Sequence, residues 1–166
     1  MNGLLADGVD LAKGVATAVK AKGKWNCEFL VCPPFTLLTS VKKALRGAKV
    51  ALGAQDCHFA EKGAHTGDIS PVMLKEIGCS YVILGHSERR ADHGESDALI
   101  NKKAVAAQAQ GLKTIICIGE TEAQRDAGKT IQQRWPFGEP CSKAVSPVAD
   151  YEMKEMVRQV SEQLNR

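Results

Sequence analysis

The sequence lacks the features that would place it in a membrane or on a nucleic acid. No uncharged apolar run approaches the ~20 residues that a membrane-spanning helix needs. Asp7 and Asp10 interrupt the stretch that would have to form the core of a signal peptide. Neither charge dominates, because 22 Lys and Arg face 19 Asp and Glu, which leaves a net charge of +3. We therefore expect a cytoplasmic protein that binds neither a membrane nor a nucleic acid.

Cysteine motifs are also missing. The six cysteines form no C-x-x-C pair and show no repeated spacing. Cys32, Cys79 and Cys117 lie in or beside apolar runs, where a free thiol behaves as a small buried hydrophobic group. A disulfide framework is untypical of a cytosolic chain of this length. The sequence thus predicts reduced structural thiols, with no metal ion and no cofactor.

What the sequence does contain is a regular alternation of two kinds of segment. Short apolar runs, rich in Val and Ile and closed by Gly or Pro, are typical of strands buried on both faces of a parallel sheet. These runs are residues 28–32, 49–53, 80–84 and 114–118. Between them, apolar residues recur at steps of three and four, which indicates helices. The alternation predicts right-handed βαβ units and an α/β fold.

The expected helices have readable faces and ends. Ser70 and Pro71 form a good N-cap and first position, and Gly78 ends that helix. The clearest helix is expected from Ser96 to Gln110, with Gly111 as its C-terminal cap. The residues expected on buried faces are Leu5, Val9, Ala12, Ala16 and Val19 in the first helix, Leu37, Leu38, Val41 and Leu45 in the second, and Leu99, Ile100, Lys103, Ala104 and Ala107 in the last.

The alternation stops after about Thr130. Residues 131–147 include the string Trp135–Pro140 and no β-branched run, so we expect a loop there. Residues 150–164 carry apolar residues at helical spacing, which predicts a terminal amphipathic helix. We therefore divide the chain into residues 1–130 and a tail of residues 131–166.

His86 is the sharpest functional signal. It follows Gly85 at the carboxyl end of an apolar run, and the polar residues Ser87–Arg90 after it can begin a short helix. Ligands of parallel α/β proteins gather beyond the carboxyl ends of the strands. A helix N-terminus disfavours the imidazolium form, so we expect a neutral ring that donates a hydrogen bond. The alternative is a histidine that only caps the loop backbone.

His86 belongs to a longer pattern that resembles the triosephosphate isomerase family. The matching stretches, in the family's order and spacing, are residues 32–35, 52–56, 63–70, 73–75, 81–90, 117–121 and 125–130. The strings Gly85–Arg90 and Cys117–Thr121 are the most specific of these. The resemblance covers residues 1–130 and implies a partial (β/α)₈ TIM barrel with parallel strands and flanking helices. A complete barrel takes about 250 residues.

The resemblance also implies roles for individual residues. In the family, a neutral histidine at the position of His86 polarises the substrate carbonyl while dihydroxyacetone phosphate and glyceraldehyde 3-phosphate interconvert in glycolysis and gluconeogenesis. The resemblance implies that Glu88 orients the catalytic cation, that Thr66 lies in a loop inserted into the second subunit of a homodimer, and that Glu95 fixes the loops beside His86. The matches to structural residues are Cys117 and Glu120.

Three groups that the family uses in catalysis have no match. They are the substrate-binding Asn and Lys of its first strand, its catalytic Glu, and the adjacent glycines that bind the phosphate. Glu139 precedes Pro140 as the catalytic Glu precedes a proline, but no apolar strand leads to it, so we expect a surface residue. Two hypotheses remain: an isomerase whose activity is impaired in this chain, or a catalytically silent partial barrel with a structural or interaction role. A flavodoxin-like module is disfavoured because Pro33 and Pro34 provide no phosphate loop.

Overall fold

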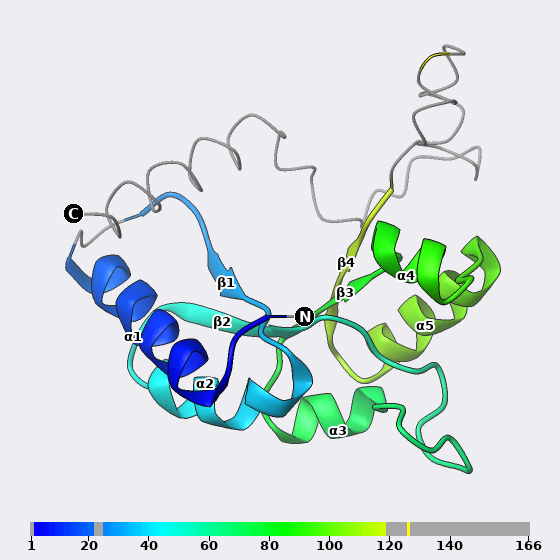
Figure 1. Ribbon diagram of the computed structural model, residues 1–166, viewed down its shortest axis with the longest axis horizontal. Coiled ribbons are helices and arrows are strands. Elements are labelled where there is room, and N and C mark those ends of the chain that lie inside the picture. Colours follow the sequence, from blue (N-terminus) through cyan, green and yellow to red (C-terminus); the bar gives the residue numbers. More distant parts are fainter. Residues whose placement is uncertain (1, 22–24, 119–125, 127–166) are drawn as a thin grey trace.

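The computed structural model describes residues 2–21, 25–118 and 126, in which helices and strands alternate (Figure 1). The strands are β1 (Phe29–Val31), β2 (Val50–Ala54), β3 (Tyr81–Leu84) and β4 (Lys113–Ile116). The helices are α1 (Leu5–Ala21), the 3₁₀ helix η1 (Phe35–Leu37), α2 (Leu38–Ala44), α3 (Pro71–Glu76), α4 (Ser87–Asp92) and α5 (Asp97–Ala109). The four predicted strands are confirmed, each within two residues of its expected bounds.

The strands form one parallel sheet in the order β1-β2-β3-β4. Each strand therefore pairs with the next one along the chain, as in a barrel, whereas a doubly wound sheet reverses its order at a switch point. In Figure 1, α1, α2, α3 and α5 lie along the same side of this curved sheet. The architecture is that of a partial TIM barrel, and the flavodoxin-like alternative is excluded by the strand order.

The core lies between the sheet and these helices. Its largest fully buried side chains include Leu38 of α2, Leu52 of β2, Leu74 of α3 and Leu84 of β3. The predicted helix faces are confirmed for α2, for α5 from Ile100 to Ala107, and for α1 from Ala12 to Val19, whereas Val9 and Leu99 are only half-buried. Leu5 is instead 56% exposed, because the buried face of α1 begins only at Ala12.

The helix ends match the predicted caps. Ser70 Oγ accepts a hydrogen bond from the Met73 N–H, and Ser96 Oγ accepts one from the Leu99 N–H, both at 3.3 Å. These bonds satisfy backbone donors that the first turn of a helix leaves unpaired. Gly111 has a φ of +71°, a conformation that suits a glycine after a helix. Local sequence signals therefore set where α3 and α5 begin and where α5 ends.

The described cysteines are free thiols, as predicted. Cys57 and Cys79 are buried, and Cys27 is exposed. Burial raises the pKa of the Cys57 thiol to about 12 and that of the Cys79 thiol to about 11. Because the thiolate is the nucleophile, these two side chains are chemically inert near neutral pH.

Several predictions concern residues outside the described part of the chain. They are the tail of residues 131–166 with its terminal helix, the structural role of Glu120, and the surface position of Glu139. Within the described residues, no helix is long and apolar enough to cross a membrane.

Leu84→Ala should destabilise the fold strongly, because Leu84 is completely buried in the core cluster. A buried Leu-to-Ala change costs about 2–5 kcal/mol through lost transfer energy and the cavity that remains. Leu4→Ala is the matched control, since Leu4 is 78% exposed and its truncation should cost less than about 0.5 kcal/mol. Urea unfolding of both variants measures the difference, and equal losses would contradict the core assignment.

Alkylation should distinguish the cysteines by position. At pH 8, iodoacetamide should modify Cys27 in the folded protein well before Cys57 and Cys79, whose raised pKa values and burial protect them. Peptide mapping by mass spectrometry gives the rate at each thiol, and denatured protein serves as the control. Rapid labelling of Cys57 in the folded state would show that its side chain opens to solvent.

Candidate active site

His86 lies at the carboxyl end of β3 and forms the N-cap of α4, as the sequence predicts. Its Nδ1 accepts a hydrogen bond from the Glu88 N–H at 3.3 Å. A ring nitrogen that accepts a hydrogen bond carries no proton, so the neutral ring holds its proton on Nε2. The imidazole is therefore both a cap for α4 and a hydrogen-bond donor through Nε2. The two interpretations of His86 are compatible.

Glu88 lies on the first turn of α4, next to His86. Its Oε2 is 3.6 Å from His86 Nδ1, and its side chain is 75% exposed. At this exposure the carboxylate is well hydrated and attracts the imidazole only weakly. The described residues thus bring Glu88 beside the candidate electrophile, and the carboxylate is open to a cation approaching from solvent.

The turn between β3 and α4 is fixed by Gly85 and Arg90. Gly85 has a φ of +71°, and a Cβ there would lie 3.0 Å from Ile100 Cδ1 and 3.3 Å from the Cys117 carbonyl oxygen. A side chain would meet both strain and crowding. Arg90 Nε donates to the Gly85 carbonyl at 2.7 Å, and Arg90 Nη1 pairs with Asp97 Oδ1 at 2.7 Å. The direction in which His86 leaves β3 is therefore set by backbone geometry and one arginine.

Cys117 contacts the end of β3 and Arg90 through its backbone. Its N–H donates to the Leu84 carbonyl at 2.8 Å, which continues the pairing of the chain after β4 with the end of β3. Its carbonyl accepts a longer hydrogen bond from Arg90 Nη2 at 3.4 Å. Cys117 thus acts through its backbone to hold the loop that carries His86.

A buried group of charges lies behind α4. Lys103 Nζ of α5 contacts Glu95 Oε1 at 2.6 Å and Asp56 Oδ2 at 2.8 Å. Arg89 Nε of α4 contacts the same two oxygens, at 2.7 Å and 2.9 Å. The side chains of Lys103 and Glu95 are only 4% and 2% exposed. We call these four residues the charge cluster, and it joins the loop after β2 to α4 and α5.

The two carboxylates of the charge cluster differ in their electrostatics. Burial opposes the charge of Glu95, but hydrogen bonds from Lys103 and Arg89 outweigh it and lower its pKa. Burial has the larger effect at Asp56 and raises its pKa despite the same cations. Glu95 is therefore the firmly ionised partner of Lys103, and its implied role in fixing the loops beside His86 stays a prediction.

Sequence reasoning found only part of the charge cluster. The resemblance pointed to Glu95 alone, while Asp56, Arg89 and Lys103 were not recognised as its partners. Lys103 did lie on the predicted apolar face of α5, and a lysine at such a position needs a buried counter-charge. That single anomaly is the signal from which the cluster could have been predicted.

Thr66 is exposed and lies in the loop between β2 and α3. A cleft of about 220 Å³ opens at the base of this loop. Its lining includes Asp56, His58, Asp68 and Arg89 but not His86. The described residues thus bring His86, Glu88 and the charge cluster together around α4, whereas Thr66 belongs to a separate loop.

Glu95→Gln should destabilise the protein by about 3 kcal/mol, because it leaves the buried Lys103 with one carboxylate in place of two. Asp97→Asn is the control, since Asp97 pairs with Arg90 at an exposed site where an ion pair contributes about 0–1 kcal/mol. Denaturant unfolding measures both losses. A Glu95→Gln loss no larger than that of the control would show that the charge cluster carries no net stability.

The comparisons with known proteins agree on one family. A sequence model described as triosephosphate isomerase matches residues 1–157, which extends past the expected boundary at residue 130. Curated triosephosphate isomerases are similar to this chain. That of Herpetosiphon aurantiacus is 65% identical over 102 residues, covering 61% of this chain and 41% of its own. That of a Bradyrhizobium species (strain ORS 278) is 54% identical over 133 residues, covering 80% of this chain and 52% of its own.

A solved structure supports the same conclusion. The crystal structure of triosephosphate isomerase from Bartonella henselae aligns with a TM-score of 0.73 at 39% sequence identity, over 84% of this chain and 60% of that one. The chain spans about half the length of the curated relatives it matches. On the sequence model, these relatives and this structure, the chain belongs to the triosephosphate isomerase family.

Proposed function

We propose that this chain carries the electrophilic half of the family's active site. In the family's reaction, dihydroxyacetone phosphate and glyceraldehyde 3-phosphate interconvert by proton transfer next to a carbonyl group. The observation that supports this is the Glu88 N–H donating to His86 Nδ1, which leaves the ring proton on Nε2. A neutral imidazole with an Nε2–H polarises a carbonyl oxygen and can return its proton to the enediolate.

The activity of the 166-residue chain by itself also depends on the catalytic base and on the groups that bind the substrate. A positioned base contributes roughly 10²–10⁴-fold. Each lost donor to a developing oxyanion costs about 3–4 kcal/mol. The substrate-binding Lys, the catalytic Glu and the adjacent glycines of the family have no match in this sequence. These losses do not add, because the groups act as a unit. We propose that the isolated chain is a strongly impaired isomerase that binds triose phosphate weakly.

The family's cellular setting extends the proposal. We place the chain in the cytoplasm, in glycolysis and gluconeogenesis, with a homodimer built through the loop that carries Thr66. Thr66 is exposed there, as a residue that reaches a second subunit has to be. The second candidate function is a catalytically silent partial barrel. The observation that favours it is the exposure of Ile116, 43% of its surface, on β4, which is an edge strand of the sheet that the described residues form and so offers an apolar position to a partner.

A coupled isomerase assay on the purified 166-residue chain tests the proposal. We expect turnover many orders of magnitude below that of the full-length Bradyrhizobium enzyme, and a further loss in His86→Gln because the electrophile is removed. His93→Gln is the matched control, since His93 is exposed at the end of α4 and has no place in the site.

Two outcomes would contradict this assignment. Equal turnover in His86→Gln and the parent would favour the silent partial barrel. Turnover within tenfold of the full-length enzyme, abolished in His86→Gln, would show that another residue of this chain replaces the catalytic base.

A further inference from the structure

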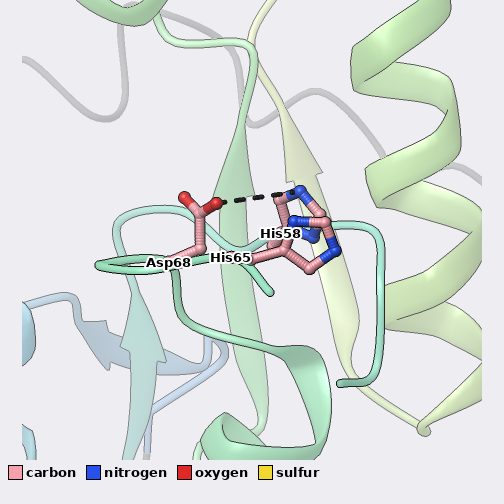
Figure 2. A group of neighbouring side chains, drawn as sticks. All are labelled: His58, His65 and Asp68. Atoms are coloured by element: carbon pink, nitrogen blue, oxygen red, sulfur yellow. Dashed lines mark ion pairs between the residues drawn. The ribbon is translucent and has the colours of Figure 1, made fainter. Parts of the chain in front are cut away.

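The loop between β2 and α3 brings two imidazoles and a carboxylate together. His58, His65 and Asp68 each offer a ligand atom, and these atoms lie within 4.8 Å of one another. Figure 2 shows the two rings facing each other with the Asp68 carboxylate directed at His58. The ring centroids of His58 and His65 are 4.1 Å apart, and His58 Nε2 is 3.8 Å from Asp68 Oδ2. None of these three residues belongs to the candidate active site.

Backbone hydrogen bonds hold the three residues in register. The His58 N–H donates to the Ile69 carbonyl at 2.8 Å, which closes the base of the loop. The Asp68 N–H donates to the His65 carbonyl at 3.0 Å, so a tight turn brings these two residues to the same place. The His58 side chain is only 15% exposed and stacks on Phe59 at 4.2 Å between centroids. The His58 ring is therefore held by its neighbours, while the side chains of His65 and Asp68 are exposed.

We propose that His58, His65 and Asp68 bind one Zn²⁺ ion, with a fourth position left to water. Imidazole nitrogens and a carboxylate oxygen are ordinary zinc ligands, at about 2.0–2.2 Å from the metal. Tetrahedral ligands at that distance lie about 3.4 Å from one another, so the present atoms, which lie within 4.8 Å of one another, have to close by up to about 1.4 Å. His65 and Asp68 are exposed, so closing the site requires their side chains to move toward His58. The cleft of about 220 Å³ that His58 and Asp68 line gives the ion its path from solvent.

The proton on His58 supplies a specific signature of this site. His58 Nδ1 accepts a hydrogen bond from the Ala60 N–H at 2.9 Å, so the neutral ring carries its proton on Nε2. When Zn²⁺ binds Nε2, the proton there passes to water and a proton from water binds Nδ1, so the ring stays neutral in its other tautomer. The Ala60 hydrogen bond then breaks, which lowers zinc affinity by about tenfold. The Ala60 amide thus reports on zinc binding at His58.

The metal-free arrangement has a simpler interpretation as well. Two stacked imidazoles beside a carboxylate stabilise a loop without any ion. However, the 3.8 Å between His58 Nε2 and Asp68 Oδ2 is too long for a hydrogen bond. A zinc ion between these atoms would satisfy both. It would also join residue 58 to residues 65 and 68, and so fix the segment that carries Thr66.

The test uses the full 166-residue chain without a histidine tag. Calorimetric titration with ZnCl₂ should give one equivalent bound. Co²⁺ should give the d–d absorption of a four-coordinate ion without thiolate-to-cobalt charge transfer. The Ala60 amide resonance should shift on zinc addition, and trypsin cleavage after the exposed Lys62 should slow. Loss of a group that only supports a ligand costs about 10–100-fold in affinity, so His65→Ala and Asp68→Asn should each weaken zinc binding by at least as much.

Matched controls come from the end of α4. His93→Ala and Asp92→Asn remove an exposed histidine and an exposed aspartate elsewhere, and both should bind zinc as the parent does. His65 and Asp68 are exposed, so their variants should keep the parent's circular dichroism. Unchanged zinc affinity in His65→Ala and Asp68→Asn would overturn the proposal. So would a cobalt spectrum dominated by thiolate, or an Ala60 amide that does not move.

Discussion

Lys103 extends from α5 into a pair of carboxylates, Asp56 and Glu95, and Arg89 of α4 completes the charge cluster. A buried ammonium group loses its hydration, and only close counter-charges offset that cost. The three segments that supply the cluster are therefore bound to one arrangement. Arg89 lies three residues after His86, so the same contacts that neutralise Lys103 also fix the orientation of α4 and of its N-cap. The position of the candidate electrophile depends on this cluster.

Two further lysines join each strand-helix unit of the fold to the next one. Lys42 Nζ of α2 donates to the Gly78 carbonyl at 3.0 Å, and Lys75 Nζ of α3 donates to the Gly111 carbonyl at 2.9 Å. In each case the lysine is 36 residues before the glycine and closes the turn that precedes the next strand. Cations near helix C-termini satisfy carbonyls that the helix leaves unpaired. Successive units are thus joined by the same contact, although their sequences show no repeat.

The sequence predicted the strands and several helix ends because these depend on local signals. Four apolar runs closed by Gly or Pro located the strands, and Ser70, Ser96 and Gly111 located helix ends. It predicted His86 because a polar residue after a buried strand is conspicuous. It did not predict the partners in the charge cluster. Asp56 and Lys103 are 47 residues apart, and their contact depends on how β2 and α5 pack. For the same reason His58 and His65 gave no signal, since only the folded loop brings them together.

His86 owes its geometry to residues close to it in the chain. The bond that fixes its ring proton comes from Glu88, and the turn that directs it is held by Gly85 and Arg90. Longer-range support comes from the charge cluster and from Cys117, all within the described residues. A hydrogen-bond donor can therefore be preorganised by half a barrel. Charge stabilisation of a transition state is different, because it draws on donors from several segments of a barrel and not only on the contacts around α4. The local contacts thus prepare the donor, and the remaining transition-state charge requires groups from other units of a barrel.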